Sequence, residues 1–370
     1  MALDLYDATQ SEADLSAYLP LVSAVVEGFR QRFPNRDAQG KVDFWPSQAL
    51  ETWECRNFTG GLENGGRVGA PTRASCVTNP STDIAGLMAV LPRLLALPGD
   101  ATTATQRSAW AAHLAALPPL PTAKAGQCFL PKCECSVSPS GKCTLPNSTT
   151  PEYSATKFAP VSAPPLGSAE LGATKANSET TELYSVQPFR LIGVGKGRGN
   201  SLAVARQTYI ERIVHCNVGW CQDLLQAASL NLTEEATALL VDRAAIGPVV
   251  SGCTSTNQKG CAKAGSGSFR FRGFTPDGEA GGNQPNNNQL SGMRTGLNKM
   301  LMMPLDDPKR RMILFPSFSV SRWNVRFKLH APLNTTIEAS CQGGKLEYLV
   351  VVPAERRDDI TVANCKVPAQ

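Results

Sequence analysis

The chain has 370 residues, of which 42% are hydrophobic and 18% are charged, and its formal net charge is +5. This length is enough to bury a large core in one or two domains. Lysine and arginine are scattered rather than clustered, so nothing suggests a nucleic-acid partner. No apolar run reaches the roughly 18 residues of a membrane span, so we expect no transmembrane segment.

The cysteines and glycosylation signals point to an oxidising compartment. The chain contains 12 cysteines and Asn-x-Ser/Thr sequons at Asn57, Asn147, Asn231 and Asn334. This combination is typical of secreted or lumenal proteins. The first residues carry acids and lack the apolar stretch of a signal peptide. We therefore expect a fragment of a longer secreted or lumenal protein whose own N-terminus is missing.

The first predicted element is a long helix over residues 11–33. Ser11 and Asp14 form a capping pair, and apolar residues follow at helical spacing. Pro20 lies inside this range, so we expect a kink or a break near Leu19.

The next segment has the composition of an acid site. It runs from Phe44 to Trp53 and sets Glu51 between Trp45 and Trp53. Indole rings around a carboxyl group disfavour the anion and raise its pKa, which is what a general acid near neutral pH requires. Tryptophan faces are also platforms for sugar rings. The alternative is that both tryptophans pack into the core while Glu51 caps a helix or faces solvent.

Two helices, over 84–97 and 103–117, follow a Gly-rich loop that Cys55 and Cys76 flank. An insertion at about 118–178 comes next, and its Pro-, Ser- and Thr-rich composition predicts a surface segment rather than a core element. Its four cysteines favour disulfides over a zinc site, because Cys-x-Cys is not the usual ligand spacing and no histidine lies nearby. We expect no metal and no cofactor.

Helical periodicity then returns, interrupted by turns and by a second insertion. The glycines from Gly193 to Gly199 lack the spacing of a phosphate-binding loop and predict a turn. The second cysteine-bearing insertion covers about 250–268. The predicted helices of this part span 179–190, 202–214, 220–230, 233–246 and 289–303.

After Pro304 the pattern changes from helical to alternating. Gly343-Gly344 predicts a hairpin turn between two strands. The sequence therefore predicts a mainly α fold with a C-terminal antiparallel β domain, divided into domains 1–308 and 309–370. The predicted strands cover 312–315, 325–329, 335–339, 345–351 and 360–362.

Several stretches resemble, in the same order, the C-terminal half of glycoside hydrolase family 95, which comprises inverting α-L-fucosidases and related α-L-galactosidases. Pro46-Ser47-Gln48-Ala49-Leu50-Glu51 resembles the family's Pro-Ser-x-Ser-Pro-Glu segment. Asp277-Gly278-Glu279-Ala280-Gly281-Gly282 resembles Asp-Gly-Asn-Phe-Gly-Gly. Further similar stretches are Asn79 to Ile84, Gly219-Trp220 with the helix after it, and Ile313 to Phe318 with Trp323.

The resemblance implies an (α/α)6 toroid that is incomplete here, because only about its last two-thirds is present. It implies Glu51 as the general acid and Asp277 as the carboxylate on the base side. An inverting glycosidase holds these two groups roughly 6.5–9.5 Å apart so that water fits between them. The family's Asn-x-Asn segment, which positions that water, is absent, so we expect the fragment alone to be an incomplete catalyst.

The resemblance also implies an oligosaccharide or polysaccharide partner. Glu279 is a rival of Asp277 for the base role. The alternative function is a non-catalytic, secreted carbohydrate-binding or structural remnant of the same fold. The candidate substrate-binding residues are Trp45, Trp53, Trp220, His215, Asp223, Glu279 and Asn283.

Overall fold

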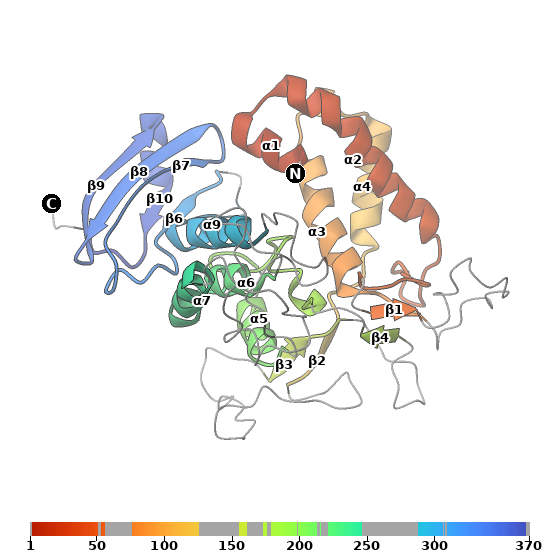
Figure 1. The fold of residues 1–370 in the computed structure, drawn as a ribbon. Helices are drawn as coiled ribbons and strands as arrows, with labels where there is room; N and C mark the ends of the chain where they lie inside the picture. The colour runs from red at the N-terminus through yellow and green to blue at the C-terminus, as the bar shows by residue number, and fades with distance from the viewer. Residues whose placement is uncertain are drawn as a thin grey trace, which may run out of the picture. The chain divides into compact units, whose positions relative to one another are not determined.

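A computed structural model describes most of the chain, in two compact units (Figure 1). Unit 1 comprises Met1–Ile192, Lys196–Ile213 and Pro332–Asn334; unit 2 comprises Gly193–Gly195, Val214–Ala331 and Thr335–Gln370. The domain boundary at 308/309 stays a prediction. Only the backbone is described for 53–55, 173–175, 245 and 288–290. The described residues are 2–50, 53–55, 76–125, 155–160, 173–175, 179–197, 199–212, 215, 221–245, 288–305, 307 and 309–367.

Unit 1 begins with two helices, α1 (Ala2–Thr9) and α2 (Glu12–Arg32). The Ser11 side chain accepts a hydrogen bond from the Asp14 backbone N–H, so the predicted cap of α2 is confirmed. Of the predicted kink or break near Leu19, the break is wrong, because α2 continues through Pro20, while the kink stays a prediction. Helix α1 was not predicted.

Helices α3 (Ser81–Leu95) and α4 (Ala104–Ala115) confirm the next two predictions. Thr103 and Gln106 form a capping box at the start of α4, which satisfies two backbone donors reciprocally. Helices α3 and α4 lie side by side (Figure 1). Side chains of α1 to α4 and of the segments that adjoin them make one apolar core, whose buried members are Leu3, Leu15, Leu19, Val26, Phe33, Val42, Phe44, Ile84, Leu87, Leu91, Leu94, Leu97, Trp110 and Leu117.

The ends of the first insertion belong to the fold, which corrects the prediction of a surface segment. β2 (Thr122–Lys124) pairs antiparallel with β3 (Thr156–Phe158), and Phe158 is buried. Lys157 forms a nearly buried ion pair of 2.8 Å with Glu211, which follows α5 (Ser201–Ile210). A second pair of short strands joins β1 (Trp53–Cys55) to β4 (Ala173–Lys175).

The predicted helix over 179–190 is wrong. Only a 3-10 turn, Thr181–Leu183, forms there, and turns follow it to Arg190. The turn predicted at the glycines is confirmed, because Gly195, Gly197 and Gly199 all have positive φ.

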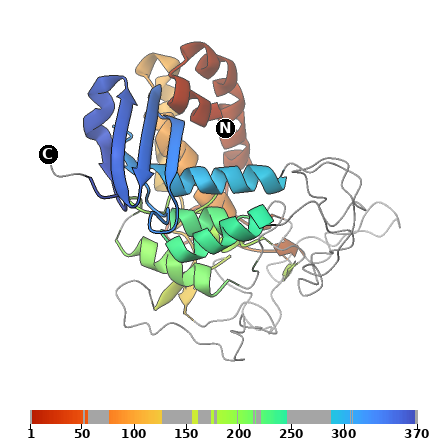
Figure 2. The ribbon, with the colours of Figure 1, turned by 60° about the vertical axis from the view of Figure 1, so that its left-hand side comes forward.

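Unit 2 contains helices α6 (Asp223–Ser229), α7 (Thr233–Ala245) and α9 (Asn288–Leu301), which confirm three predicted helices at shorter lengths. They lie side by side in Figure 2. Glycines of α9 allow this approach, because a Cβ built on Gly296 would lie 2.5 Å from Leu224. A Cβ on Gly292 would lie 2.2 Å from the Arg243 guanidinium.

The C-terminal strands form two sheets. β7 (Val325–Ala331), β8 (Thr335–Gln342) and β9 (Lys345–Val352) are antiparallel, and Gly343 and Gly344 make the predicted hairpin turn with φ of 54° and 74°. The other sheet has the order β10-β6-β5, in which β10 is parallel to β6 and β5 is antiparallel to it. Its strands are β5 (Met302–Pro304), β6 (Met312–Leu314) and β10 (Ile360–Val362).

The described part is therefore mixed α/β, with helices preceding an antiparallel C-terminal sheet. The helix predicted to reach residue 303 ends at Leu301, and β5 takes its place. A disulfide between Cys341 and Cys365 joins β8 to the chain beyond β10. None of the helices described here is long and apolar enough to cross a membrane.

Candidate functional site

The candidate site lies in unit 1, where the segment Phe44–Leu50 meets the start of α3. Asn79 fixes one end of this contact, because its side-chain oxygen accepts a 2.9 Å hydrogen bond from the Phe44 backbone N–H. The Asn79 N–H donates back to the Phe44 carbonyl at 3.1 Å. Asn79 has φ of 51°, a left-handed conformation that asparagine tolerates better than most residues.

Ser47 makes the second contact. Its backbone forms an antiparallel bridge with Val77, with N···O distances of 3.2 and 3.1 Å. Its hydroxyl donates a 2.8 Å hydrogen bond to the Asp83 carboxylate in the first turn of α3. The segment is thus held to α3 by backbone and side-chain bonds, and we call Trp45, Ser47, Asn79, Thr82 and Asp83 the α3 site.

Burial raises the pKa of Asp83 from 3.8 to about 6, although the Ser47 hydrogen bond and the charge of Arg32 both act to lower it. The reason is that a carboxylate loses hydration when it leaves water, and this loss outweighs one hydrogen bond and one cation here. Asp83 keeps part of its surface exposed. A partly accessible carboxyl group with a pKa near 6 can both donate and accept a proton close to neutral pH.

The surroundings of Asp83 are polar as well as buried. The Ser81 hydroxyl donates to the Thr181 carbonyl at 2.9 Å, and both residues are buried. The hydroxyl of Thr82 is buried without a hydrogen-bond partner among the described residues. Trp45 is partly buried on the segment that Ser47 anchors. The α3 site thus combines an aromatic side chain, hydroxyl groups and a carboxyl group that can take up a proton.

Most of the predicted site residues lie outside the described part of the chain. This holds for both predicted catalytic residues, Glu51 and Asp277. Trp53 is described only through its backbone, which pairs with Lys175 in β1 and β4. The other predicted binding residues outside the described part are Trp220, Glu279 and Asn283.

His215 and Asp223 lie in unit 2. His215 is partly buried, while Asp223 is buried at the start of α6. Asp223 acts electrostatically on Arg243 of α7, whose guanidinium donates to the Cys221 carbonyl and is also buried. Burial lowers the pKa of Arg243 to about 10 and the charge of Asp223 opposes that change. Asp223 therefore acts as a counter-charge of a buried arginine, and its role in substrate binding stays a prediction.

Sequence reasoning missed Asp83 and its contact with Ser47. Asn79 to Ile84 was recognised as a helix start, where an acidic residue is common because it interacts favourably with the helix dipole. Because that role is common, an acidic residue at this position does not by itself indicate a functional site. The one available signal was the order of the two stretches in the resemblance, in which this helix start follows the acid segment.

Among the described residues, no group of three or more His, Cys, Asp or Glu side chains could hold a metal ion. No protein-family model matches the chain, and no curated protein matches it significantly. The function must therefore be argued from the α3 site and from the motifs.

Proposed function

We propose that this protein is a secreted glycoside hydrolase-like protein that cleaves α-L-fucosides or related glycosides with inversion. In this proposal Glu51 is the general acid and Asp277 the carboxylate on the base side. The helices form an incomplete (α/α)6 toroid that binds an oligosaccharide or polysaccharide.

The observation that carries the proposal is the anchoring of the segment Phe44–Leu50 on α3. This segment precedes Glu51 directly and holds the motif that resembles the family's acid segment. Ser47 and Asn79 fix its backbone, and Ala49 is fully buried. A general acid must be held within hydrogen-bond reach of the leaving oxygen, and a rigid support favours such placement.

Asp83 is a second candidate for the general acid. Its carboxyl group bonds to Ser47, four residues before Glu51. It supports Glu51 indirectly by anchoring the segment, and it is also a rival for the proton-donating role because it is partly protonated near neutral pH. These two roles make different predictions. A positioning role is retained by asparagine, which still accepts a hydrogen bond from Ser47, whereas an acid role is not.

Secretion is part of the proposal. The disulfide between Cys341 and Cys365 supports it, and Cys76 and Cys221 are also disulfide-bonded, with partners outside the side chains that the structure describes. Disulfides persist in oxidising compartments and are rare in the cytosol.

The test is release of sugar from p-nitrophenyl α-L-fucoside, α-L-galactoside and β-L-arabinoside and from a 2'-fucosylated oligosaccharide. Wild type is compared with Glu51→Gln, Asp277→Asn and Asp83→Asn, and with Asp358→Asn as a control at an exposed aspartate. The full-length gene product is used where it is longer than this chain. We expect Glu51→Gln and Asp277→Asn to lose activity by several orders of magnitude, and Asp83→Asn and the control to keep most of it.

Loss of activity in Asp83→Asn with an active Glu51→Gln variant would assign the acid role to Asp83 instead. Absence of activity on every substrate from a folded wild-type protein would overturn the proposed reaction. Retained binding of the same oligosaccharide, measured by calorimetry, would then favour the alternative of a non-catalytic carbohydrate-binding protein.

A further inference from the structure

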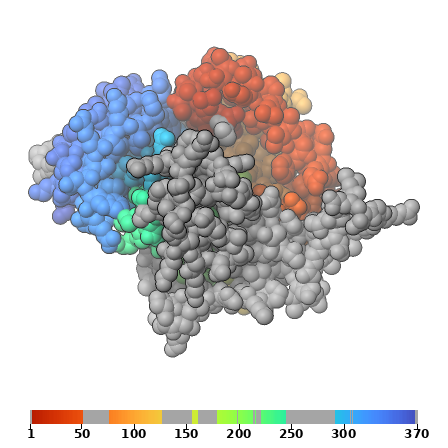
Figure 3. Space-filling model, viewed as in Figure 1, coloured from red at the N-terminus to blue at the C-terminus, as the bar shows by residue number. Residues whose placement is uncertain are grey.

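Helix α2 exposes a row of apolar side chains beside the face that it buries in the core. It buries Leu15, Leu19 and Val26. Tyr18, Leu21 and Val25 are nevertheless 45%, 66% and 53% exposed. Single exposed apolar residues are normal, but a contiguous row of large ones marks an interaction surface. Figure 3 shows atoms of α2, in red, at the surface of the molecule.

Further residues extend this row in both directions, and the spacing of the residues along it is symmetric. At alternating spacings of four and three residues, the positions on this face are Asp14, Tyr18, Leu21, Val25, Gly28 and Arg32. Residues spaced in this way lie along one side of a helix. We call these six residues the α2 stripe. Its spacings are the same when it is counted from either end, while its charge is acidic at the start and basic at the end.

We propose that two copies of this protein associate through their α2 stripes, with the two helices antiparallel. Such a pairing aligns Asp14 of each copy with Arg32 of the other. It places Leu21 against Val25, and Tyr18 against Gly28. The same patch serves on both copies, as a two-fold symmetric interface requires.

The local structure fits this occupant. A Cβ built on Gly28 has no atom within 4 Å, so the space beside Gly28 is open to an incoming tyrosine ring. Arg32 is exposed, although its guanidinium also lies over the Phe33 ring, 5.4 Å from the ring centroid, and Asp14 is partly exposed. Antiparallel helices also bring opposite ends of their dipoles together. Because one helix pair buries less area than a standard interface, we expect dimers at micromolar rather than nanomolar protein concentrations.

Sedimentation equilibrium of the protein from 1 to 200 µM, a range set by the expected micromolar affinity, tests the apolar centre. We expect wild type to shift from monomer to dimer across this range. Leu21→Glu should weaken association at least about tenfold. The matched control is Ser16→Glu, which adds the same charge to an exposed position on another side of α2 and should leave association unchanged. Melting curves establish that each variant is folded. A monomeric wild type, or a dimer that Leu21→Glu leaves intact, would overturn the proposal.

The charges provide a second, stricter test. Asp14→Lys alone places lysine against Arg32 of the other copy, and Arg32→Glu alone places glutamate against Asp14. Each variant should therefore self-associate more weakly than wild type. Mixed together they should form a heterodimer, because both charge pairs are then restored. Failure of the mixture to associate more tightly than either variant alone would exclude the antiparallel register.

Discussion

Asp83 shows how one residue couples the α3 site to stability. The pKa of Asp83 is about 6 in the folded protein, whereas an unperturbed aspartate has a pKa of 3.8. The folded state therefore holds the proton more tightly than the unfolded chain does. Stability is therefore greatest below about pH 4 and falls as pH rises toward 6, as far as this group is concerned. The difference corresponds to on the order of 3 kcal/mol.

We expect Asp83→Asn to remove this dependence of stability on pH. Asparagine carries no charge at any pH and still accepts the hydrogen bond from Ser47. The free energy of unfolding of the variant at pH 7 should exceed that of wild type by about 1–3 kcal/mol, and the two should converge at pH 4. Urea unfolding at both pH values measures this. An Asp83→Asn variant less stable than wild type at pH 7 would show that the ionised carboxylate is stabilising instead.

The contribution of His113 to stability changes with pH in the opposite direction to that of Asp83. His113 is buried on α4, and both ring nitrogens lack a hydrogen-bond partner in the described structure. Burial lowers the pKa of His113 below 6.5, the charges of Arg36 and Arg30 lower it further, and Glu27 acts against them. The unfolded chain therefore takes up this proton first, and stability is lost as pH falls below about 6.5.

His113→Leu should stabilise the protein. It removes two unpartnered polar atoms, each of which costs about 1–3 kcal/mol when buried. It also removes the buried imidazole, which takes up a proton less readily in the folded state than in the unfolded chain. The gain in unfolding free energy should be larger at pH 5 than at pH 7.5. Phe29→Leu, an apolar change at a side chain packed against the core of unit 1, controls for general effects on that core. Equal gains at both pH values would show that His113 does not titrate in this range.

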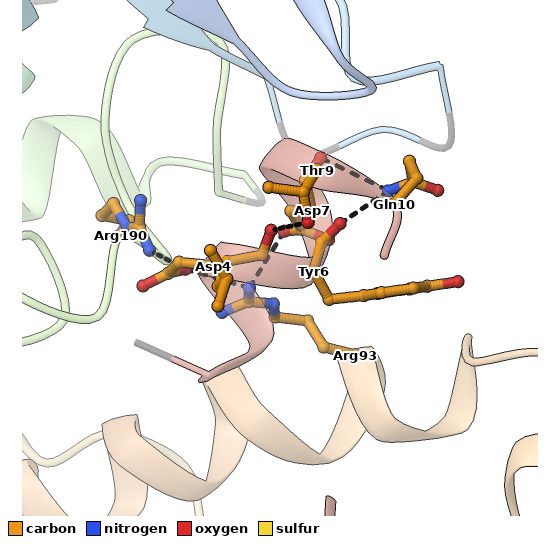
Figure 4. Close-up of polar contacts among 8 residues, drawn as sticks. Asp4, Tyr6, Asp7, Thr9, Gln10, Arg93 and Arg190 are labelled. Atoms are coloured by element: carbon orange, nitrogen blue, oxygen red, sulfur yellow. Dashed lines mark hydrogen bonds and ion pairs between the residues drawn. The ribbon is translucent and has the colours of Figure 1, made fainter. Parts of the chain in front are cut away.

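At the scale of elements, α1 is held by ion pairs rather than by a large apolar face, since Leu3 is its buried residue. Figure 4 shows Arg93 of α3 between Asp4 and Asp7 of α1, with both N···O distances 2.9 Å. Arg190 also pairs with Asp4. Although burial raises it, the charges of Arg190 and Arg93 lower the pKa of Asp4 to about 2.

We expect Arg93→Met to loosen α1 selectively. Partly exposed ion pairs are each worth at most about 1 kcal/mol, so global stability should fall only slightly. Amide exchange in residues 2–9 should accelerate severalfold relative to α4. Because the pKa of Asp4 is lowered, its contribution is present above pH 4 and is lost as pH falls toward 2. Arg357→Met, at an exposed arginine, is the control. Unchanged exchange in α1 would mean that its backbone contacts suffice.

The elements also show what a sequence can predict. Helices such as α3 and α4 were predicted because burial on one face imposes a period on their apolar residues. The stretch 179–190 was predicted as a helix, but Thr180, Thr181 and Val186 have low helix propensity and Pro188 cannot donate a helical hydrogen bond, and only a 3-10 turn forms there. The anchoring of the segment Phe44–Leu50 by Asp83 was not predicted, because Ser47 and Asp83 lie 36 residues apart and only the fold joins them.

At the scale of the whole molecule, covalent cross-links connect the cysteine count to the proposed compartment. Cys341 and Cys365 are both buried, and their bond spans a sequence separation of 24 residues. Closing such a loop removes conformational freedom from the unfolded chain. The C-terminal end is joined to the β7-β8-β9 sheet in a second way, because the Leu346 N–H donates to the Lys366 carbonyl at 2.9 Å.

Replacing both cysteines, as Cys341→Ala with Cys365→Ala, should lower the free energy of unfolding by about 3 kcal/mol, the loss expected for a loop of this length. The loss arises mainly from the unfolded state, so the spectrum of the folded variant should stay unchanged. Wild type in dithiothreitol should retain its disulfide while folded, since both sulfurs are buried, and should approach the variant's stability only after unfolding and refolding under reduction. Equal stability of the variant and the oxidised wild type would mean that hydrogen bonds such as Leu346–Lys366 already restrain this end. An oxidising compartment would then not be needed for the C-terminal sheet.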